Sequence, residues 1–267
     1  MRTVVCIKQI LDPEIPPQDF AVDPASREAV RGRAPLVIGP FDLNALEVAM
    51  QLKEQAGGAV TIVTVGGPEA RDALKRGLAM GGDDAVLVTD PGLQRPDPRQ
   101  TALALAAVVR KLGDVDLVLC GRQSGDWDFG QVGGRLAEAL GWPAVPLVTQ
   151  VRAQAGTLTF RQESVDGVAL LEAAPPMVAV VTNAEGNRPR LPKVRETMLA
   201  GRKPVHVWTA ADLGLTSEVL GEGGRELDVV DLFIPPAPPG CEFVEGQTGA
   251  EKGRVLARRL LDRMGAW

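Results

Sequence analysis

The chain has 267 residues, 45% of them hydrophobic, and a formal net charge of −5 from 29 basic and 34 acidic residues. This acidic balance and the 4% aromatic content exclude the basic, ring-rich surface that nucleic-acid binding requires. No run approaches the roughly 18 apolar residues of a membrane span, so we expect no membrane insertion.

Apolar runs typical of buried strands recur along the chain. The first run starts at once, without a charged region and a long apolar stretch before it, so we expect no secretory signal. Runs without polar alternation are typical of parallel strands covered on both faces. We predict strands over residues 3–7, 59–65, 84–89, 115–120 and 178–182.

Helical patterns lie between these strands. The alternation of strand and helix predicts right-handed crossovers and a doubly wound, mostly parallel sheet. N-cap residues and helix-starting prolines mark where the helices begin. The predicted helices are 43–55 with Asp42 as its cap, 68–80, a third opened by Asp97 and Pro98, and a fourth with Val132, Leu136 and Leu140 at a spacing of four.

Residues 145–173 have a different texture. Three short strands, 147–153, 157–163 and 167–173, are joined by tight turns and predict an antiparallel insert attached to the sheet. The polar stretch Ser26 to Arg33 is expected at the tip of an early hairpin.

The most informative stretch is the loop that follows the strand ending at Cys120, where glycines stand at 121, 125, 130, 133 and 134. A glycine-rich turn between a buried strand and a helix offers free N–H groups and the positive end of the helix dipole to a phosphate. Such turns also occur only because the chain must turn. The turns at 39–42 and 66–68 favour a nucleotide site, because ligands of doubly wound sheets bind at the carboxyl ends of strands.

No standard fingerprint names the nucleotide. The chain has no GxxxxGK[ST] motif and no GxGxxG after its first strand, which disfavours a hydride-transferring dehydrogenase. Asp126 and Asp128 could bind Mg²⁺ or ribose hydroxyls, or could be solvated loop carboxylates or caps of the next helix. Without further convergent carboxylates, we favour the ribose or structural interpretation.

Hydrolytic and metal chemistry are poorly supplied. Cys6, Cys120 and Cys241 are odd in number and widely spaced, which predicts a reducing compartment, the cytoplasm, rather than a disulfide framework. No CxxC or Cys/His cluster is present, and there is no GxSxG elbow. His206, the single histidine, is expected to be a half-buried structural residue of a strand.

Residues 183–204 form a basic segment in an acidic protein. The ordinary explanation is a solvated loop. However, Leu191 and Pro192 stand in its middle, and an apolar anchor ringed by charge is typical of a small docking site for another protein. The cations are Arg188, Arg190, Lys193, Arg195, Arg202 and Lys203.

The run Pro235 to Pro239 is typical of a stiff linker. After it, Thr248 and Glu251 predict a capping box that opens a final helix with Leu256, Leu260 and Met264 on one face. Such a helix packs on its own domain or reaches a partner. We therefore predict a nucleotide-binding domain over residues 1–234 and a linker with a C-terminal helix over 235–267.

Several motifs, in the right order and over nearly the whole length, resemble the β subunit of electron-transfer flavoprotein. They are the opening Val-Cys-Ile-Lys-Gln-Ile, the turn and helix 39–47, the Ala-Met-Gly-Gly-Asp-Asp run at 79–84, the loop 117–133, the stretch from Asp166 to Thr182, and Arg190-Leu-Pro-Lys193.

The resemblance implies an adenine-nucleotide α-hydrolase-like fold and a heterodimer with a larger α subunit that carries a redox FAD. The β chain would have no bond-breaking catalytic residues. It would bind its own nucleotide, AMP in many members and a second FAD, which takes hydride from NADH, in electron-bifurcating ones. Phe41 would approach the flavin of the α subunit. The implied nucleotide-binding residues are Cys6, Gly39, Pro40, Phe41, Asp42, Gly66, Arg122, Gln123, Ser124, Gly125, Asp126, Asp128, Gly130, Gln131, Val132 and Gly133.

The resemblance also implies that residues 183–204 are a partner-recognition loop with Leu191 as its anchor. Its partners would be acyl-CoA dehydrogenases, other flavin dehydrogenases or a quinone-linked oxidoreductase, and its cations would steer an acidic partner into a salt-sensitive encounter. The implied contact residues are Arg190, Leu191, Pro192, Lys193, Arg195 and Met198.

Departures from the family pattern bear on the nucleotide. Gly39 stands where asparagine is common, and Phe129 where bifurcating members carry threonine, yet 131–133 and 41–47 look more like the bifurcating or nitrogen-fixation-associated branch. We favour FAD over AMP. The rival interpretations are an adenine-nucleotide-binding enzyme or stress protein of related topology, for which no Ser-Gly-Gly-x-Asp-Ser loop is present, and a nucleotide sensor that is stable without an α chain.

Overall fold

The structure is a computed structural model that describes residues 1–236 and 240–265. It divides into two units, Met1–Asp231 and Leu232–Trp267, which we describe separately. Residues 237–239 of the predicted linker and the last two residues lie outside the described part. The predicted domain boundary after residue 234 stays a prediction.

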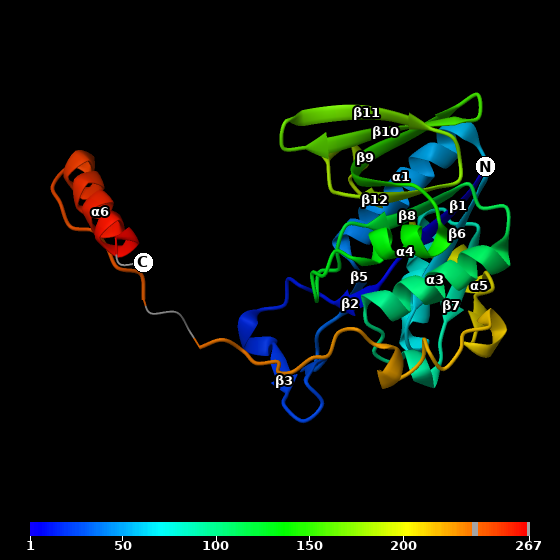
Figure 1. Cartoon of the computed structure of the whole chain (residues 1–267), viewed down its shortest axis with the longest axis horizontal. Coiled ribbons are helices and arrows are strands. Elements are labelled where there is room, and N and C mark those ends of the chain that lie inside the picture. The colour runs from blue at the N-terminus through cyan, green and yellow to red at the C-terminus, as the bar shows by residue number, and fades with distance from the viewer. Residues whose placement is uncertain (237–239, 266–267) are drawn as a thin grey trace. The chain divides into compact units, whose positions relative to one another are not determined.

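The centre of the first unit is a nine-stranded sheet in the order β11-β10-β9-β12-β8-β1-β6-β7-β13 (Figure 1). The seven strands β9, β12, β8, β1, β6, β7 and β13, which are neighbours in this order, run parallel. At one end of the sheet, β9, β10 and β11 form an antiparallel meander. The predicted mostly parallel sheet with an antiparallel insert is therefore confirmed. The strands are β1 Arg2–Cys6, β6 Ala59–Val65, β7 Asp84–Val88, β8 Leu117–Gly121, β9 Ala144–Gln154, β10 Thr157–Ser164, β11 Gly167–Ala173, β12 Met177–Val181 and β13 His206–Trp208.

Helices cover both faces of this sheet. Successive residues of a strand point to opposite faces, so Val5 packs into the core beneath α1 and α2, whereas Val4 packs into the core beneath α3 and α4. The helix α5 lies against α2. The bounds are α1 Pro40–Ala56, α2 Arg71–Met80, α3 Pro98–Leu112, α4 Val132–Leu140 and α5 Val194–Arg202.

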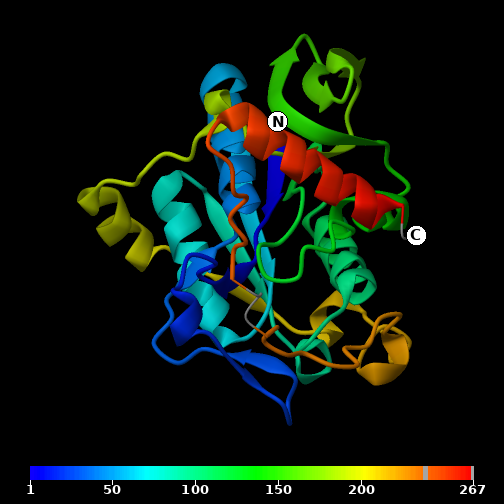
Figure 2. The same ribbon diagram turned by 90° about the vertical axis from the view of Figure 1, so that its left-hand side faces the viewer.

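The residues between β1 and α1 in the chain form two small antiparallel sheets, and the hairpin of residues 21–30 lies at the end of the unit opposite the antiparallel meander (Figures 1 and 2). One pairs β2 (Gln9–Leu11) with β5 (Leu36–Ile38), and the other pairs β3 (Ala21–Asp23) with β4 (Glu28–Val30). The hairpin was predicted from its polar tip, but it turns a few residues earlier. Asp23 sets the turn, because its Oδ1 accepts a hydrogen bond from the N–H of Ala25 at 3.0 Å.

The chain direction makes the end of β1 a switch point. From β1 the chain moves outward through β6 and β7, and it then returns through α3 to place β8 on the other side of β1. Ligands of doubly wound sheets bind outside the carboxyl ends of strands where the order reverses. This edge, between β1 and β8, is therefore the first place to look for a site.

The second unit contains one helix, α6 (Gly249–Met264), among its described residues. The predicted capping box is present: the Thr248 side chain accepts from the N–H of Glu251 at 3.2 Å, and Glu251 Oε2 accepts from the N–H of Thr248 at 3.3 Å. Leu256, Leu260 and Met264 are all exposed. The helix therefore presents an apolar face that its own unit does not cover.

Two local predictions are wrong. Asp42 does not cap α1, because the helix begins earlier, at Pro40, with Gly39 as its N-cap. His206 is exposed rather than half-buried, since β13 is an edge strand of the sheet. Within the described ranges, no helix is both long and apolar enough to cross a membrane.

Candidate functional site

The candidate site begins where β1 and β8 end. The chain leaves β1 at Lys8, whose backbone N–H donates to Asp42 Oδ2 at 2.8 Å, and the N–H of Gly39 donates back to the carbonyl of Lys8 at 3.0 Å. These bonds fix the first turn of α1 against the end of the central strand. They explain why Asp42 is turned inward and cannot cap its own helix.

Gly121, the last residue of β8, lets this turn approach the sheet. A Cβ at this position would lie 2.3 Å from Asp42 Oδ1 and 2.8 Å from the backbone nitrogen of Asp42. Real Cβ atoms do not approach backbone atoms so closely, so the position needs glycine. The glycine after β8 thus has a packing reason that is independent of any ligand.

Asp42 is a buried acid at the centre of this arrangement. Burial raises its pKa to about 7, while the backbone N–H groups of Lys8 and Gly121 and the charge of Lys8 act in the opposite direction. Asp126 adds a smaller upward contribution to this pKa. The carboxyl therefore changes charge near neutral pH at the edge of the candidate site.

The raised pKa of Asp42 predicts a pH-dependent stability. Between its ordinary value of 3.8 and about 7, the folded protein holds a proton that the unfolded chain has lost. Stability therefore falls as pH rises through this window, by roughly 1.4 kcal/mol per pH unit for this group. We expect Asp42→Asn to remove this slope.

The check is urea unfolding at several pH values from about 5 to 8. The difference in free energy of unfolding between Asp42→Asn and wild type should rise with pH up to about 7 and then level off. Asp72→Asn, at an exposed position of α2, is the control and should leave the difference constant. Parallel curves for Asp42→Asn and wild type would contradict the assignment.

The loop between β8 and α4 is held by its own side chains. Lys8 Nζ pairs with Asp126 Oδ2 at 2.6 Å, and Gln123 Nε2 donates to Asp128 Oδ1 at 2.7 Å. Trp127 and Phe129 stack with ring centroids 5.9 Å apart. Both carboxylates thus have internal partners, and the described residues contain no cluster of acidic, histidine or cysteine side chains that could hold a metal ion. A ribose contact by Asp126 or Asp128 stays a prediction.

The loop delivers the chain to the N-terminus of α4. No side chain caps this helix, in contrast to α3, where Asp97 and Gln100 form a complete capping box. The first-turn N–H groups of α4 therefore have no side-chain acceptor, which leaves them available to an anion. Gly130, just before this turn, has a φ of 62° that glycine adopts without strain.

Gly133 has a role that the sequence did not reveal. A Cβ at this position would lie 2.5 Å from Val180 Cγ2 in β12. Its bare backbone lets α4 pack on the sheet, so a side chain introduced there would press against β12 rather than extend into the loop. The next residue, Gly134, has no atom within 4 Å of its would-be Cβ. Of these two glycines, Gly134 is the one where a side chain can be added without a clash.

The remaining predicted nucleotide-site residues lie around this edge. Arg122 places its guanidinium 4.6 Å from the centroid of the Phe41 ring. Gly66 lies one strand further along, at the end of β6. The Cys6 side chain instead lies in the core, beside its register partner Cys120. The hydrogen bond with Cys120 and burial raise the pKa of the Cys6 thiol. Their contacts with a nucleotide remain predictions.

The basic segment lies elsewhere, around α5. Leu191 is 83% exposed, and Val194, Met198 and Leu199 are exposed with it. We call these four residues the docking surface. Lys193 and Arg195 beside it form no ion pair among the residues that the structure describes.

Arg190 behaves differently from the other cations of this segment. Its guanidinium forms ion pairs with Glu47 and Glu54 of α1. The sequence did not indicate three residues that hold these segments in place. They are Lys8, which pairs with Asp126, Glu47, which pairs with Arg190, and the fully buried Asn187. A buried acid at position 47 gives no signal in the sequence, because its partner is 143 residues away.

Comparison with known proteins identifies a matching family and several similar proteins. Residues 29–213 match the electron transfer flavoprotein domain. The chain is 34% identical over 264 residues to the caffeyl-CoA reductase-Etf complex subunit CarD of Acetobacterium woodii, covering 98% of this chain and 99% of that protein. It is 38% identical over 229 residues to the electron transfer flavoprotein subunit beta of Clostridium acetobutylicum, covering 86% of each. It is 34% identical over 266 residues to the protein FixA of Azotobacter vinelandii, covering 96% of this chain and 92% of that protein.

Proposed function

This chain belongs to the electron transfer flavoprotein family, and we propose that it is the β subunit of a heterodimer that passes electrons between flavoenzymes. Its own contribution is to bind an adenine nucleotide, to complete one side of the flavin site of an α subunit, and to dock on electron-transfer partners. It carries out no bond-breaking step of its own.

The observation that carries the nucleotide proposal is the switch point between β1 and β8. A glycine-rich loop leaves β8 there and leads to the uncapped N-terminus of α4. In this proposal the first-turn N–H groups of α4 hold the phosphates. The 39–42 turn, fixed through Asp42 and Lys8, provides the opposite wall.

We propose FAD as the nucleotide, with AMP as the alternative. One of the similar proteins is named as a subunit of a caffeyl-CoA reductase-Etf complex, and another is named FixA. These names support the resemblance to the bifurcating or nitrogen-fixation-associated branch. A second flavin would allow two electrons taken up as hydride to be sent to different acceptors. The backbone N–H groups of this loop bind any adenosine phosphate, so the choice rests on a measurement of the bound nucleotide.

The partner proposals rest on two exposed apolar surfaces. The docking surface around α5 would meet a flavin dehydrogenase, and Lys193 and Arg195 would accelerate the encounter with an acidic partner. The apolar face of α6 would be covered by the α subunit, since an isolated helix of this length gains little stability in water without packing.

The test is the nucleotide content of the heterodimer after co-expression with an α subunit, when the complex is denatured and its nucleotides are separated by chromatography. We expect two FAD per heterodimer. One FAD and one AMP would assign the chain to single-electron carriers instead. One FAD with no second adenine nucleotide would contradict the interpretation of the 121–133 loop. A β chain that is stable and nucleotide-bound without any α subunit would favour the sensor alternative.

A further inference from the structure

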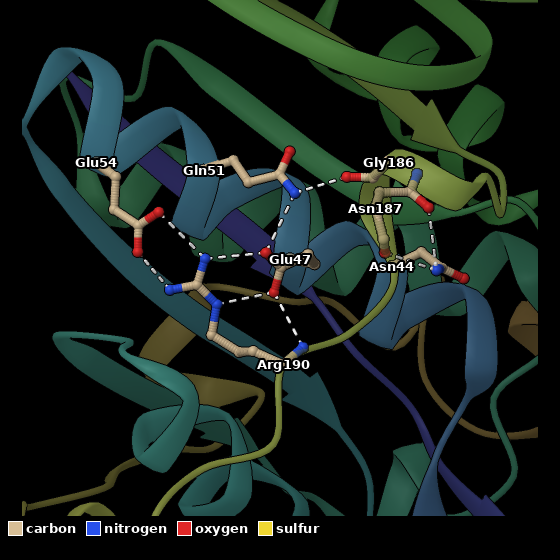
Figure 3. A network of polar contacts seen from close by, with 7 residues as sticks. All are labelled: Asn44, Glu47, Gln51, Glu54, Gly186, Asn187 and Arg190. Carbon is tan, nitrogen blue, oxygen red and sulfur yellow. Dashed lines mark hydrogen bonds and ion pairs between the residues drawn. The ribbon is translucent and has the colours of Figure 1, made fainter.

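Four polar residues of α1 hold the segment that leads to the docking surface. Asn44, Glu47, Gln51 and Glu54 follow one another at spacings of three, four and three, which places them on one side of the helix. Figure 3 shows that residues 186–190 lie along this side, with the side chains of α1 directed toward them. Asn44 and Gln51 donate to the carbonyls of Asn187 and Gly186, at 3.0 and 2.8 Å.

Asn187 anchors the segment into the body of the protein. It is completely buried, and its Nδ2 donates to the carbonyls of Thr149 and Thr182 at 3.2 and 2.9 Å. Its Oδ1 accepts from the N–H of Ala184 at 2.8 Å. Each polar atom of this side chain therefore has a partner, and the backbone at position 187 is fixed.

Arg190 closes the contact three residues later (Figure 3). Its Nε and Nη2 donate to Oε2 and Oε1 of Glu47 at 2.8 and 2.9 Å, and its backbone N–H donates to the same carboxylate at 3.1 Å. The Glu47 side chain is only 7% exposed. Glu54 pairs with Nη1 from the solvent side, and Arg190 holds the pKa of Glu54 below its ordinary value.

The far end of α5 is tied as well. Lys75 Nζ donates to the carbonyls of Ala200 and Gly201 at 3.2 and 3.0 Å, and Lys203 Nζ donates to the carbonyl of Gly82 at 2.7 Å. The docking surface lies between these two ties. Its first residue, Leu191, directly follows Arg190.

We propose that Arg190 is a positioning residue: its clasp with Glu47 and Glu54 fixes the docking surface in one orientation before a partner arrives. This inference rests on the proposed function and reassigns Arg190 from a partner contact to an internal tie. Fixing the surface in advance lowers the entropy lost on binding, so the clasp strengthens docking without touching the partner. Glu54 matters because it can be changed without leaving a buried charge unpaired.

The test uses the complete heterodimer with a reduced acyl-CoA dehydrogenase as electron donor, and it measures two quantities for each variant. The first is KM and kcat for electron transfer. The second is hydrogen exchange in peptides covering residues 188–203. We expect Arg190→Gln to raise KM by on the order of tenfold with little change in kcat, because orientation and not chemistry is lost. Exchange in residues 188–199 should become faster in the same variant.

The variants separate positioning from contact. Arg190→Lys, which keeps the positive charge, should raise KM and the exchange rate less than Arg190→Gln does. Glu54→Gln should also raise both quantities to a smaller extent, and it provides a test even if Arg190→Gln folds poorly. Arg95→Gln, which breaks the exposed pair with Glu28, is the matched control and should change neither quantity. A raised KM with unchanged exchange would make Arg190 a direct contact and overturn the proposal. Faster exchange with unchanged KM would overturn it too.

The outcome is distinguishable from a failure of the proposed function. If Leu191→Ala leaves KM unchanged while exchange in Arg190→Gln is faster, the docking surface itself is misassigned. If Leu191→Ala raises KM but neither Arg190→Gln nor Glu54→Gln does, the docking surface stands and the positioning role is wrong.

Discussion

Leu191→Ala is expected to lower kcat/KM for electron transfer with a flavin dehydrogenase by about 10- to 100-fold, because burying a leucine side chain contributes about 1.5–3 kcal/mol. The residue is 83% exposed in the free chain and is the most exposed residue of the docking surface. Stopped-flow reduction of the heterodimer by the reduced dehydrogenase measures the effect. Nucleotide content should be unchanged, since the loop that we propose binds the nucleotide lies elsewhere.

Leu170→Ala provides the matched control, because this leucine of β11 is also exposed but is not part of the docking surface. It should leave kcat/KM within about twofold of wild type. Equal losses for the two variants would point to a general effect on the protein. A normal rate for Leu191→Ala would remove the docking role.

The adjacent glycines of α4 are expected to respond in opposite ways to a carboxylate. Gly133→Glu forces a charged side chain against the half-buried Val180 of β12, where a Cβ alone would already lie 2.5 Å from Cγ2. We expect it to lower the free energy of unfolding by several kcal/mol, at least about 3, and to prevent assembly. Gly134→Glu places the charge in open space and should leave stability within about 1 kcal/mol of wild type.

Gly134→Glu is therefore the clean test of phosphate binding at α4. A negative charge in the first turn should repel the phosphates and reduce the second nucleotide to a minor fraction, while FAD of the α subunit is retained. Gly134→Gln, of equal size but neutral, should keep most of the nucleotide. Thermal unfolding and nucleotide analysis of the same preparations separate the two effects. Full occupancy in Gly134→Glu would exclude the α4 N-terminus as the phosphate site.

Much of the fold was accessible from the sequence because its signals are local. Apolar runs bounded by glycine and proline located the parallel strands, and the Asp97 and Thr248 caps located two helix starts. The antiparallel meander followed from its tight turns. Asp42 misled this reasoning, because an acid before an apolar run has the composition of a cap whether or not its side chain is drawn inward by distant backbone groups.

The site was only partly accessible for the same reason. The glycines at 121 and 133 are visible in the sequence, but the atoms that require them belong to α1 and β12. The pairing of Lys8 with Asp126 spans 118 residues, and that of Arg190 with Glu47 spans 143. Such pairs depend on which strand ends meet, and a single sequence shows only that each residue is charged.

The central position of β1 has a consequence for how the chain is made. Its five residues, Arg2–Cys6, are synthesised before both of their neighbours in the sheet, residues 59–63 and 117–120. This apolar strand therefore stays unpaired on one side until residues 117–120 have been synthesised. We expect this segment to expose apolar surface during translation, and a slow passage through residues 60–120 to increase losses to aggregation.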